Sequence, residues 1–282
     1  MAAERSVSYR RSMAPTQEHS APYRPDFAPV AALMADSTRA VILNALLAGR
    51  PLAAGELGRM AGVSPATASA HLAKLLDGGM ITVTVQGRHR YYRLAGHEIA
   101  AVLEAISRIS PPTPVKNLRQ SREAAALDEA RTCYDHLAGR AGVALLDAML
   151  AGHLLQEHKT GKPSRSRTRG GEAASATFYE ITGQGTDTMA SFGINIDQVR
   201  RSRRHFAGSC LDWTQRRRHL NGALGAAVTA RLFERGWIER GERRRSIRVT
   251  DAGREGLAKT FGWSVGPAGG DGTVAPVAGA RP

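Results

Sequence analysis

The chain has 282 residues, a formal net charge of +14 and two cysteines. This length allows one large domain or two ordinary domains with a real hydrophobic core. Two cysteines exclude a disulfide framework, and no stretch approaches the roughly 18 apolar residues of a membrane-spanning helix. The excess of positive charge favours polyanionic partners, and we expect no contact with a membrane.

The N-terminal third of the sequence begins with an arginine- and serine-containing stretch, residues 1–25, that predicts a disordered basic arm. A folded domain is predicted over residues 26–110. Within it, Leu57, Met60 and Ala61 have the spacing of one face of a short helix, and Gly62 with Val63 fits a tight turn after it. This pattern predicts the first helix and the turn of a helix-turn-helix.

Ser64 and Pro65 are suited to begin the second helix, because serine caps a helix and proline loses only an amide hydrogen that would be unpaired there. Gly78 and Gly79 end it. Its core-facing stripe consists of Ala68, Leu72, Leu75 and Leu76. The opposite face is small and polar, and it fits a major groove about 12 Å wide. We predict that this face, the recognition surface, contacts DNA through Ser64, Pro65, Thr67, Ser69, His71 and Lys74.

A β-hairpin, or wing, is predicted next, with strands over residues 80–85 and 91–94 and a turn over residues 86–90. The turn carries Arg88, His89 and Arg90. A cationic hairpin beside a recognition helix is well placed to contact phosphates or the adjacent minor groove. The alternative interpretation is a solvated charged turn on a small α+β domain.

The motif SxxTxSxHLxxL, which begins at Ser64, is followed by a Gly-Arg wing tip and by Tyr91 and Tyr92. With the preceding helices, this pattern over residues 27–110 resembles the ArsR/SmtB family of bacterial winged-helix repressors. The resemblance implies a cytoplasmic, nucleoid-associated homodimer that represses transcription from a double-stranded DNA operator. It also implies that the DNA contacts include Thr67, Ser69, His71, Arg88 and Arg90.

The metal sites of that family transfer poorly to this chain. Residues 52–60, in the first helix of the helix-turn-helix, contain no cysteine or histidine. The helix after the wing offers only His97, Glu98 and Glu104, and one histidine does not make a site. Its apolar residues have the spacing of a packed helix, and the resemblance implies that they form the dimer contact: Ile99, Val102, Leu103 and Ile106.

Prolines over residues 111–117 predict a linker, and residues 118–265 contain an internal repeat. His136 aligned with His219 matches HLAGRAGVAL to HLNGALGAAV, and a one-residue adjustment then aligns Gly152 with Gly236 and Leu154 with Ile238. The copies cover about residues 133–195 and 210–263, with a disordered insertion at about 157–175 and a disordered tail at 266–282.

Each copy predicts a helix, a glycine-terminated helix end, a hairpin and a short helix, which is a winged-helix-like order. The predicted fold class is therefore mainly α with small β-wings (α+β). Gly139 with Gly142, and Gly222 with Gly225, suggest close helix contact between the copies or across a dimer. The arginines in this half, residues 243–245 among them, are interpreted as solvated, with a second DNA-contacting surface as the alternative.

Both cysteines precede the His-Leu of their repeat. Cys133 and His136 are interpreted as lying on one helical face. If the copies pack about a pseudo-twofold axis, these residues could converge with Cys210 and His219 as a Cys₂His₂ set for zinc or a softer metal. The thiols could instead form a redox switch. The remaining alternative is two buried cysteines and two histidines that bond to the backbone.

No phosphate-binding glycine loop, nucleophile elbow or HExxH motif occurs, so we do not expect an enzyme. The sequence predicts a dimeric repressor that a signal acting on the C-terminal half releases from its operator. The signal is a metal ion, a redox change or a small-molecule inducer; no cofactor is certain, and a transition or soft metal ion is the candidate. The alternative is an architectural DNA-binding protein without a ligand, in which the repeat only assembles dimers.

Overall fold

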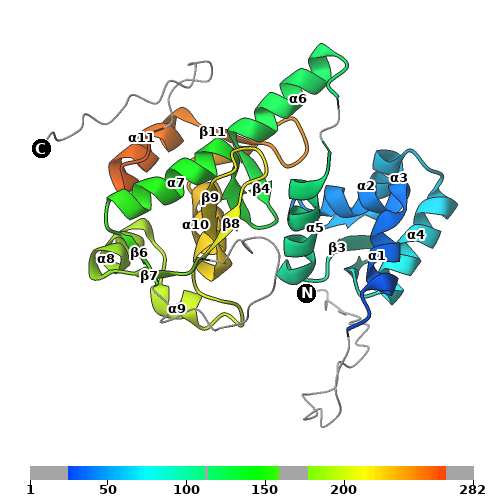
Figure 1. Ribbon diagram of the computed structural model, residues 1–282, viewed down its shortest axis with the longest axis horizontal. Helices are drawn as coiled ribbons and strands as arrows, with labels where there is room; N and C mark the ends of the chain where they lie inside the picture. Colours follow the sequence, from blue (N-terminus) through cyan, green and yellow to red (C-terminus); the bar gives the residue numbers. More distant parts are fainter. Residues whose placement is uncertain (1–24, 112–113, 159–176, 265–282) are drawn as a thin grey trace, which may run out of the picture.

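The computed structural model describes residues 25–111, 114–158 and 177–264. The described chain forms an N-terminal part, residues 25–111, beside a larger C-terminal part, residues 114–264 (Figure 1). The predicted arm, the insertion and the tail lie almost wholly outside the described residues. Within the described ranges, no helix has the length and apolar character needed to cross a membrane.

The N-terminal part is a winged helix-turn-helix. Its elements are α1 (Ala28–Ala35), α2 (Ser37–Leu46), β1 (Leu52–Ala53), α3 (Ala54–Ala61), α4 (Pro65–Asp77), β2 (Ile81–Gln86), β3 (His89–Leu94) and α5 (His97–Ile109). The strands form an antiparallel sheet in the order β1-β3-β2. Ile42, Leu57, Leu72 and Leu75 are fully buried in one core, so the predicted stripe of α4 does face inward. The fold class is α+β, as predicted.

The wing hairpin is longer than the sequence pattern suggested. Gln86 pairs with His89, so the turn is only Gly87 and Arg88 and the return strand begins at His89 rather than at Tyr91. Gly87 has a positive φ of 57°, which suits a tight hairpin turn and lets the ladder continue to its end. The prediction of a turn over residues 86–90 was wrong in this respect.

The C-terminal part begins with α6 (Leu118–Glu129) and then contains both copies of the repeat. The first copy has β4 (Arg131–Cys133), β5 (His136–Ala138), α7 (Gly139–Ala151), β6 (Leu155–Glu157), β7 (Tyr179–Ile181), α8 (Gly183–Phe192) and α9 (Ile196–Arg200). The second has β8 (Gly208–Leu211), β9 (Arg218–Asn221), α10 (Gly222–Glu234), β10 (Ile238–Arg240), β11 (Ile247–Val249) and α11 (Asp251–Phe261). Both copies share one hydrophobic core, in which Met149 and Leu232 occupy matching positions with no exposed surface.

The duplication extends to hydrogen bonds. Thr182 caps α8 and donates to His153 O at 2.7 Å, and Thr250 caps α11 and donates to Gly236 O at 2.8 Å. His153 and Gly236 both have a left-handed φ, 53° and 65°, and each follows a long helix. The structure therefore aligns His153 with Gly236, and the one-residue adjustment that aligned Gly152 with Gly236 was wrong. Glycine was the stronger sequence signal, but here a histidine adopts the left-handed conformation.

Each copy also begins with a hairpin that the sequence pattern did not predict. Cys133 pairs with His136 across β4 and β5, and Cys210 pairs with His219 across β8 and β9. The interpretation of Cys133 and His136 as residues on one helical face was wrong, because they are cross-strand neighbours. Opposite residues of an antiparallel pair project from the same face of the hairpin, so each hairpin still presents one thiol and one imidazole together.

Gly142 in α7 and Gly225 in α10 let each long helix approach the hairpin of its own copy closely. A Cβ atom on Gly142 would lie 2.3 Å from Leu137 O, and one on Gly225 would lie 2.8 Å from Leu220 O. The other copy's hairpin lies at ordinary contact distance, 3.6 Å from Gly142 to His219 Cβ and 3.4 Å from Gly225 to His136 Cβ. The glycines thus serve contacts between a helix and a hairpin, not the helix contact that was predicted. Gly139 and Gly222 are not in helix interiors, since they begin α7 and α10 with φ values of 75° and 82°.

Candidate DNA-recognition surface and cysteine–histidine cluster

Helix α4 presents the recognition surface. Ser64 caps it and accepts a hydrogen bond from Thr67 N at 3.2 Å, and Pro65 occupies the first turn. Thr67, Ser69 and Lys74 are exposed, as are Ser64 and Pro65, while the buried residues of α4 lie on its other side. The local sequence therefore produces a capped helix whose outer face is small and polar, a shape that fits a major groove.

His71 differs from the other predicted members of the recognition surface. Its side chain is 17% exposed, and its Nδ1 lies 3.5 Å from Asp36 Oδ1. Asp36 caps α2 by accepting from Arg39 N at 2.9 Å, and this hydrogen bond lowers the pKa of the Asp36 carboxyl. His71 thus links α4 to α2, which leaves it less available to bases than Ser69.

Arg88, His89 and Arg90 are all exposed at the wing tip. Within the described residues, neither arginine has a salt-bridge partner among the acidic side chains. The tip therefore presents unneutralised positive charge on the part of the chain that contains α4, as contact with phosphates would require.

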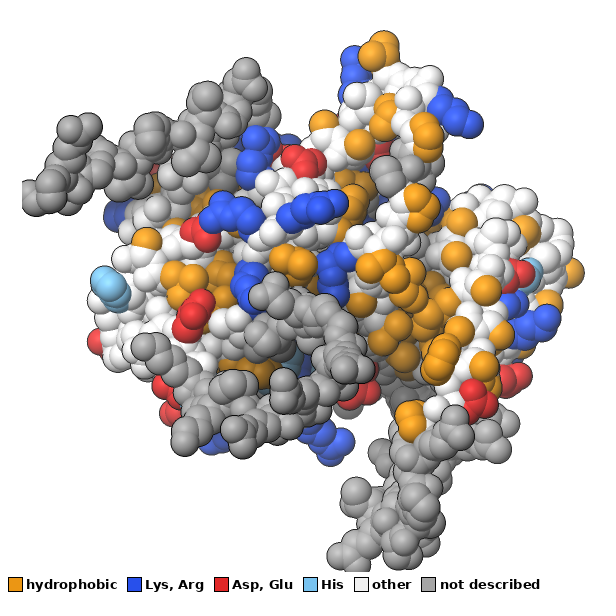
Figure 2. Space-filling view, in the orientation of Figure 1, with side chains coloured by type: hydrophobic (Ala, Val, Ile, Leu, Met, Phe, Trp, Pro, Cys, Tyr) orange, Lys and Arg blue, Asp and Glu red, His pale blue; other side chains and the backbone are white. Residues whose placement is uncertain are grey.

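Helix α5 divides the predicted dimer residues between two sides. Ile99 and Leu103 pack against the N-terminal core, whereas Val102 and Ile106 are 44% and 39% exposed. Figure 2 shows hydrophobic side chains gathered over α5 and α1. We call the exposed large hydrophobic residues of these two helices and their ends the apolar patch; they are Phe27, Val30, Val102, Ile106 and Ile109.

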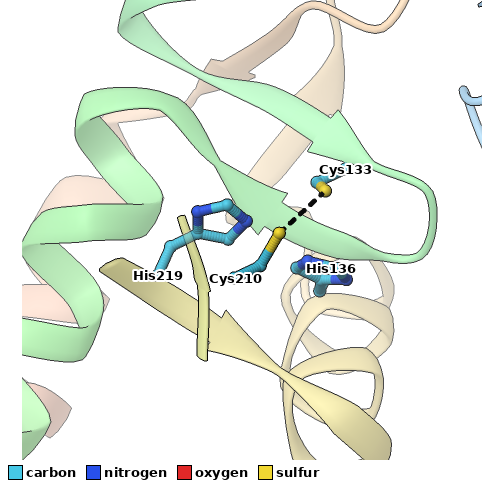
Figure 3. A group of neighbouring side chains, drawn as sticks. All are labelled: Cys133, His136, Cys210 and His219. Atoms are coloured by element: carbon cyan, nitrogen blue, oxygen red, sulfur yellow. Dashed lines mark hydrogen bonds between the residues drawn. The ribbon is translucent and has the colours of Figure 1, made fainter. Parts of the chain in front are cut away.

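The four cysteine and histidine residues that the sequence singled out lie together where hairpins β4–β5 and β8–β9 meet. The Sγ atoms of Cys133 and Cys210 are 3.9 Å apart, and the imidazoles of His136 and His219 lie beside Cys210 (Figure 3). One ligand atom from each of the four residues lies within 4.8 Å of all the others. We call this group the Cys–His cluster.

The cluster is largely enclosed, and its histidines have an unusual hydrogen-bonding state. His136 and His219 are 8% and 1% exposed, and the Nε2 atom of each is buried without a hydrogen-bond partner of normal geometry among the described residues. Their Nδ1 atoms face carboxylates: Asp135 Oδ1 lies 3.3 Å from that of His136, and Asp212 Oδ2 lies 3.5 Å from that of His219. Asp135 orients His136 through a hydrogen bond, whereas Asp212 only lies near His219, whose Nδ1 is also buried without a hydrogen-bond partner of normal geometry among the described residues. The Nε2 atoms of both imidazoles are therefore available as ligands once the rings are neutral.

The carboxylates are held in turn by arginines. Asp135 Oδ2 accepts from Arg204 at 2.7 Å, and Asp212 Oδ2 lies 2.9 Å from buried Arg131. Burial opposes ionisation of Asp212, but the charge of Arg131 and backbone hydrogen bonds outweigh it and hold the pKa of Asp212 well below its usual range. Both carboxylates are therefore ionised, and Asp135 favours the protonated form of the His136 imidazole that it faces.

The two thiols of the cluster have pKa values shifted in opposite directions, and the pKa of His136 is also shifted. The Cys133 thiol donates toward Cys210 and lowers the pKa of Cys210, and the two imidazoles add to this effect; the same hydrogen bond and burial raise the pKa of Cys133. Burial alone would lower the pKa of His136, but Asp135 and Cys210 outweigh it and raise this pKa to about 9. The arrangement favours a thiolate at Cys210, and the thiolate is the form that binds metals.

The turn of hairpin β4–β5 attaches the cluster to the N-terminal part. Tyr134 N donates to Leu47 O at 3.0 Å, and the Tyr134 ring packs against the core of the N-terminal part. Gly49 makes this approach close, because a Cβ atom there would lie 2.0 Å from Tyr134 O. The residue that follows Cys133 is thus fixed against the DNA-binding part.

A second connection runs through Arg245. Its Nε donates to Thr132 O at 3.0 Å, its Nη2 forms an ion pair with Glu104 of α5, and its Nη1 lies 3.5 Å from Asn44 Oδ1 of α2. Arg245 is 9% exposed, so the interpretation of residues 243–245 as solvated was wrong for this arginine. Sequence reasoning dismissed Glu104 as a metal ligand and gave it no other role, although one acidic residue between apolar neighbours was a signal for a buried partner.

A pocket opens between α5 and the two hairpins. Its lining includes His97, Glu104, Cys133, His136, His205 and Cys210. The Cys–His cluster is therefore accessible from the boundary between the two parts, and α5 forms one wall of that access.

These features define a winged helix-turn-helix DNA-binding protein with a duplicated C-terminal part attached to its last helix. The family described as "Helix-turn-helix domain" matches residues 34–84. The uncharacterized HTH-type transcriptional regulator YdfF of Bacillus subtilis (strain 168) is 40% identical over 235 residues, 83% of this chain and 96% of YdfF. The chain belongs to this family of HTH-type transcriptional regulators, and it is a DNA-binding transcriptional regulator.

Two similar solved structures each cover a third of this chain or less. The homodimeric winged helix-turn-helix domain of Mb0332 from Mycobacterium bovis, a possible ArsR-family regulator, is 33% identical and covers 28% of this chain and 72% of its own, with a TM-score of 0.27. The cadmium metal-sensor CMTR from Mycobacterium tuberculosis is 30% identical over 33% of this chain and 99% of its own, with a TM-score of 0.26. TM-scores this low do not support a family assignment. The assignment depends instead on YdfF and on the helix-turn-helix match, and both agree with the resemblance predicted from the sequence.

Proposed function

We propose that the chain is a homodimeric repressor that binds a pseudo-palindromic DNA operator and is released when a signal acts on its C-terminal part. The observation that carries this proposal is the contact of the C-terminal part with α5. Buried Glu104 on one side of α5 pairs with Arg245, while Val102 and Ile106 on the exposed side belong to the apolar patch. A change in the C-terminal part thus reaches the helix that we expect to form the dimer contact.

A second copy of the chain is the expected occupant of the apolar patch. Its residues are large, hydrophobic and exposed, and a surface of this kind marks an interaction site. A twofold dimer would present two α4 helices to successive major grooves about 34 Å apart. Two helices held at the wrong separation cannot both bind, so a small movement of α5 is sufficient to lose most of the specific affinity.

The operator is found by selecting bound duplexes from a random pool with the full chain, and affinities are then measured on the selected and on a scrambled duplex. We expect Ser69→Ala to cost about 1–3 kcal/mol of binding free energy on the selected duplex and far less on the scrambled one, because only base contacts distinguish the two. Ser202→Ala, an exposed serine outside α4, is the matched control.

Two results would contradict the proposal. Equal losses on both duplexes for Ser69→Ala would show that α4 does not recognise bases. A dimer that survives Ile106→Glu in sedimentation equilibrium would show that the apolar patch is not the contact between copies, because a charge in a buried apolar interface is strongly unfavourable.

A further inference from the structure

We propose that Cys133, His136, Cys210 and His219 bind one Zn²⁺ ion in tetrahedral geometry, and that this ion is the signal that lowers operator affinity. The first half of the proposal stands on the cluster alone. The second half rests on the proposed function, since it needs an operator to release.

The distances suit zinc. A Zn–S bond of about 2.3 Å gives a tetrahedral edge of about 3.8 Å between two sulfurs, and the Sγ atoms of Cys133 and Cys210 are 3.9 Å apart. All four ligand atoms lie within 4.8 Å of one another, so small side-chain movements complete the tetrahedron. Two thiolates with two imidazoles form a ligand set that Zn²⁺ prefers in structural sites.

The histidines distinguish a metal site from a thiol pair. A redox switch needs only the two sulfurs, whereas here a ring nitrogen of each histidine lies within 4.8 Å of both, and the Nε2 atom of each imidazole is buried without a hydrogen-bond partner of normal geometry among the described residues. The Nδ1 atom of His136 hydrogen-bonds to Asp135, which is the usual support of a zinc-bound histidine, and the Nδ1 atom of His219 lies 3.5 Å from Asp212 Oδ2. Neither feature follows from a core that merely contains two cysteines, because an unpaired buried nitrogen destabilises the fold unless it binds something.

The repeat explains why the site combines both copies. Each hairpin supplies one thiol and one imidazole from directly opposite positions, so neither copy alone offers more than two ligands from this group. Binding an ion fixes hairpin β4–β5 relative to hairpin β8–β9. A zinc ligand must be a thiolate or a neutral imidazole, so binding releases the proton of the Cys133 thiol and the proton of the His136 imidazolium to solvent. The ion reaches the cluster through the pocket beside α5.

Both connections to the DNA-binding part begin beside a zinc ligand. Tyr134, which follows Cys133, donates to Leu47 O of the N-terminal part. Thr132, which precedes Cys133, accepts from Arg245, and Arg245 pairs with Glu104 of α5. A movement of Cys133 toward the ion therefore displaces the contacts that set the position of α5.

The binding half is tested by titrating Co²⁺ into the full chain after removal of metals with a chelator under reducing conditions. We expect one equivalent to produce the visible absorption of tetrahedral Co²⁺ and a thiolate-to-cobalt charge-transfer band, both abolished by Zn²⁺. The variant Cys133→Ser/Cys210→Ser loses the charge-transfer band, and Cys210→Ser, at a partly exposed position, weakens it. His97→Gln, which removes a histidine from the same pocket but not from the cluster, is the matched control and keeps the spectrum.

Circular dichroism shows whether each variant folds. The titration of the wild-type chain tests the site even if a variant does not fold. Absence of the tetrahedral spectrum in the wild-type chain with both thiols reduced would overturn the site. An unchanged spectrum in the double cysteine variant would overturn it as well.

The regulatory half is tested by measuring operator affinity with saturating Zn²⁺ and with chelator. We expect Zn²⁺ to weaken operator binding at least about tenfold, within the usual range of coupling between two sites, and to leave binding of a scrambled duplex unchanged. Tight Co²⁺ binding without any change in operator affinity would overturn the regulatory half alone. A chain that prefers no duplex sequence, with or without metal, would overturn the proposed function while the Co²⁺ titration still decides the site.

Discussion

The two parts of the chain differ in what they bury. The N-terminal part has an apolar core, and its only buried polar or charged side chain among the described residues is Glu104. The described buried polar residues of the C-terminal part include Arg131, His136, Asp212, His219 and Arg245. Buried polar groups cost stability unless they are paired, so their concentration in one part requires an explanation beyond packing.

This difference in buried residues fits a division of roles, in which the N-terminal part recognises DNA and the C-terminal part responds to a signal. An apolar core holds α4 and the wing in one arrangement, which base recognition requires. The buried polar groups of the C-terminal part lead from the Cys–His cluster to α5, and Glu104 is where they enter the N-terminal part. Polar contacts of this kind depend on the protonation or ligand state of each member, so they suit the part that responds to a signal.

Removing Arg245 should have the largest effect on stability. We expect Arg245→Met to lower the free energy of unfolding by about 3–5 kcal/mol, because it leaves the Glu104 carboxylate buried without its partner. Urea denaturation measures this loss, with exposed Arg244→Met as the matched control, for which we expect a change within about 0.5 kcal/mol. The double variant Glu104→Met/Arg245→Met should recover most of the stability; failure to recover it would show that the pair is not the main connection.

The sequence predicted the N-terminal part well because its signals are local. The cap at Ser64, the proline after it and the apolar stripe of α4 lie within a few turns of one helix. The wing was predicted short by two residues, since the positive φ of Gly87 permits a tight turn that composition did not reveal. His71 matched the motif, yet its contact with Asp36 depends on how α4 packs against α2.

The Cys–His cluster was predictable from the repeat, whereas the hairpins that carry it and its connection to α5 were not. Cys and His recur at matching positions, so packing about a pseudo-twofold axis that passes near these residues brings them together. Hairpin β4–β5 escaped prediction because its turn is Tyr134-Asp135 instead of the usual Asn-Gly, and Tyr134 adopts a φ of 62°. The pair of Arg245 and Glu104 joins positions 141 residues apart, a distance at which one sequence gives no signal.

A smaller effect on metal affinity should distinguish a residue that orients a ligand of the Cys–His cluster from the ligands themselves. We expect Asp135→Asn to weaken Co²⁺ binding by about 10–100-fold without abolishing the tetrahedral spectrum, because Asp135 orients His136 but does not itself bind the ion. Competition with a chelator of known affinity measures this loss. Asp147→Asn, at an exposed carboxylate paired with Arg217, is the control and should leave the affinity unchanged. An unchanged affinity in Asp135→Asn would mean that His136 keeps its orientation without this carboxylate.

The smallest change in DNA affinity should come from substitutions in the wing, and these substitutions should leave the C-terminal part unaffected. Arg88→Ala and Arg90→Ala remove exposed charges that have no acidic partner in the described part of the chain, so we expect each to weaken binding to selected and scrambled duplexes alike. The slope of log K against log salt concentration should fall by about 0.9 for each phosphate that the protein no longer neutralises, because fewer counterions are released. Arg254→Ala, on the exposed surface of α11, is the control and should keep both the affinity and the slope. If the salt slope of the wing variants equals that of the wild-type chain, the wing points away from DNA. If the slope falls while the effect of Zn²⁺ on operator affinity remains, DNA recognition and the response to metal belong to separate parts of the molecule.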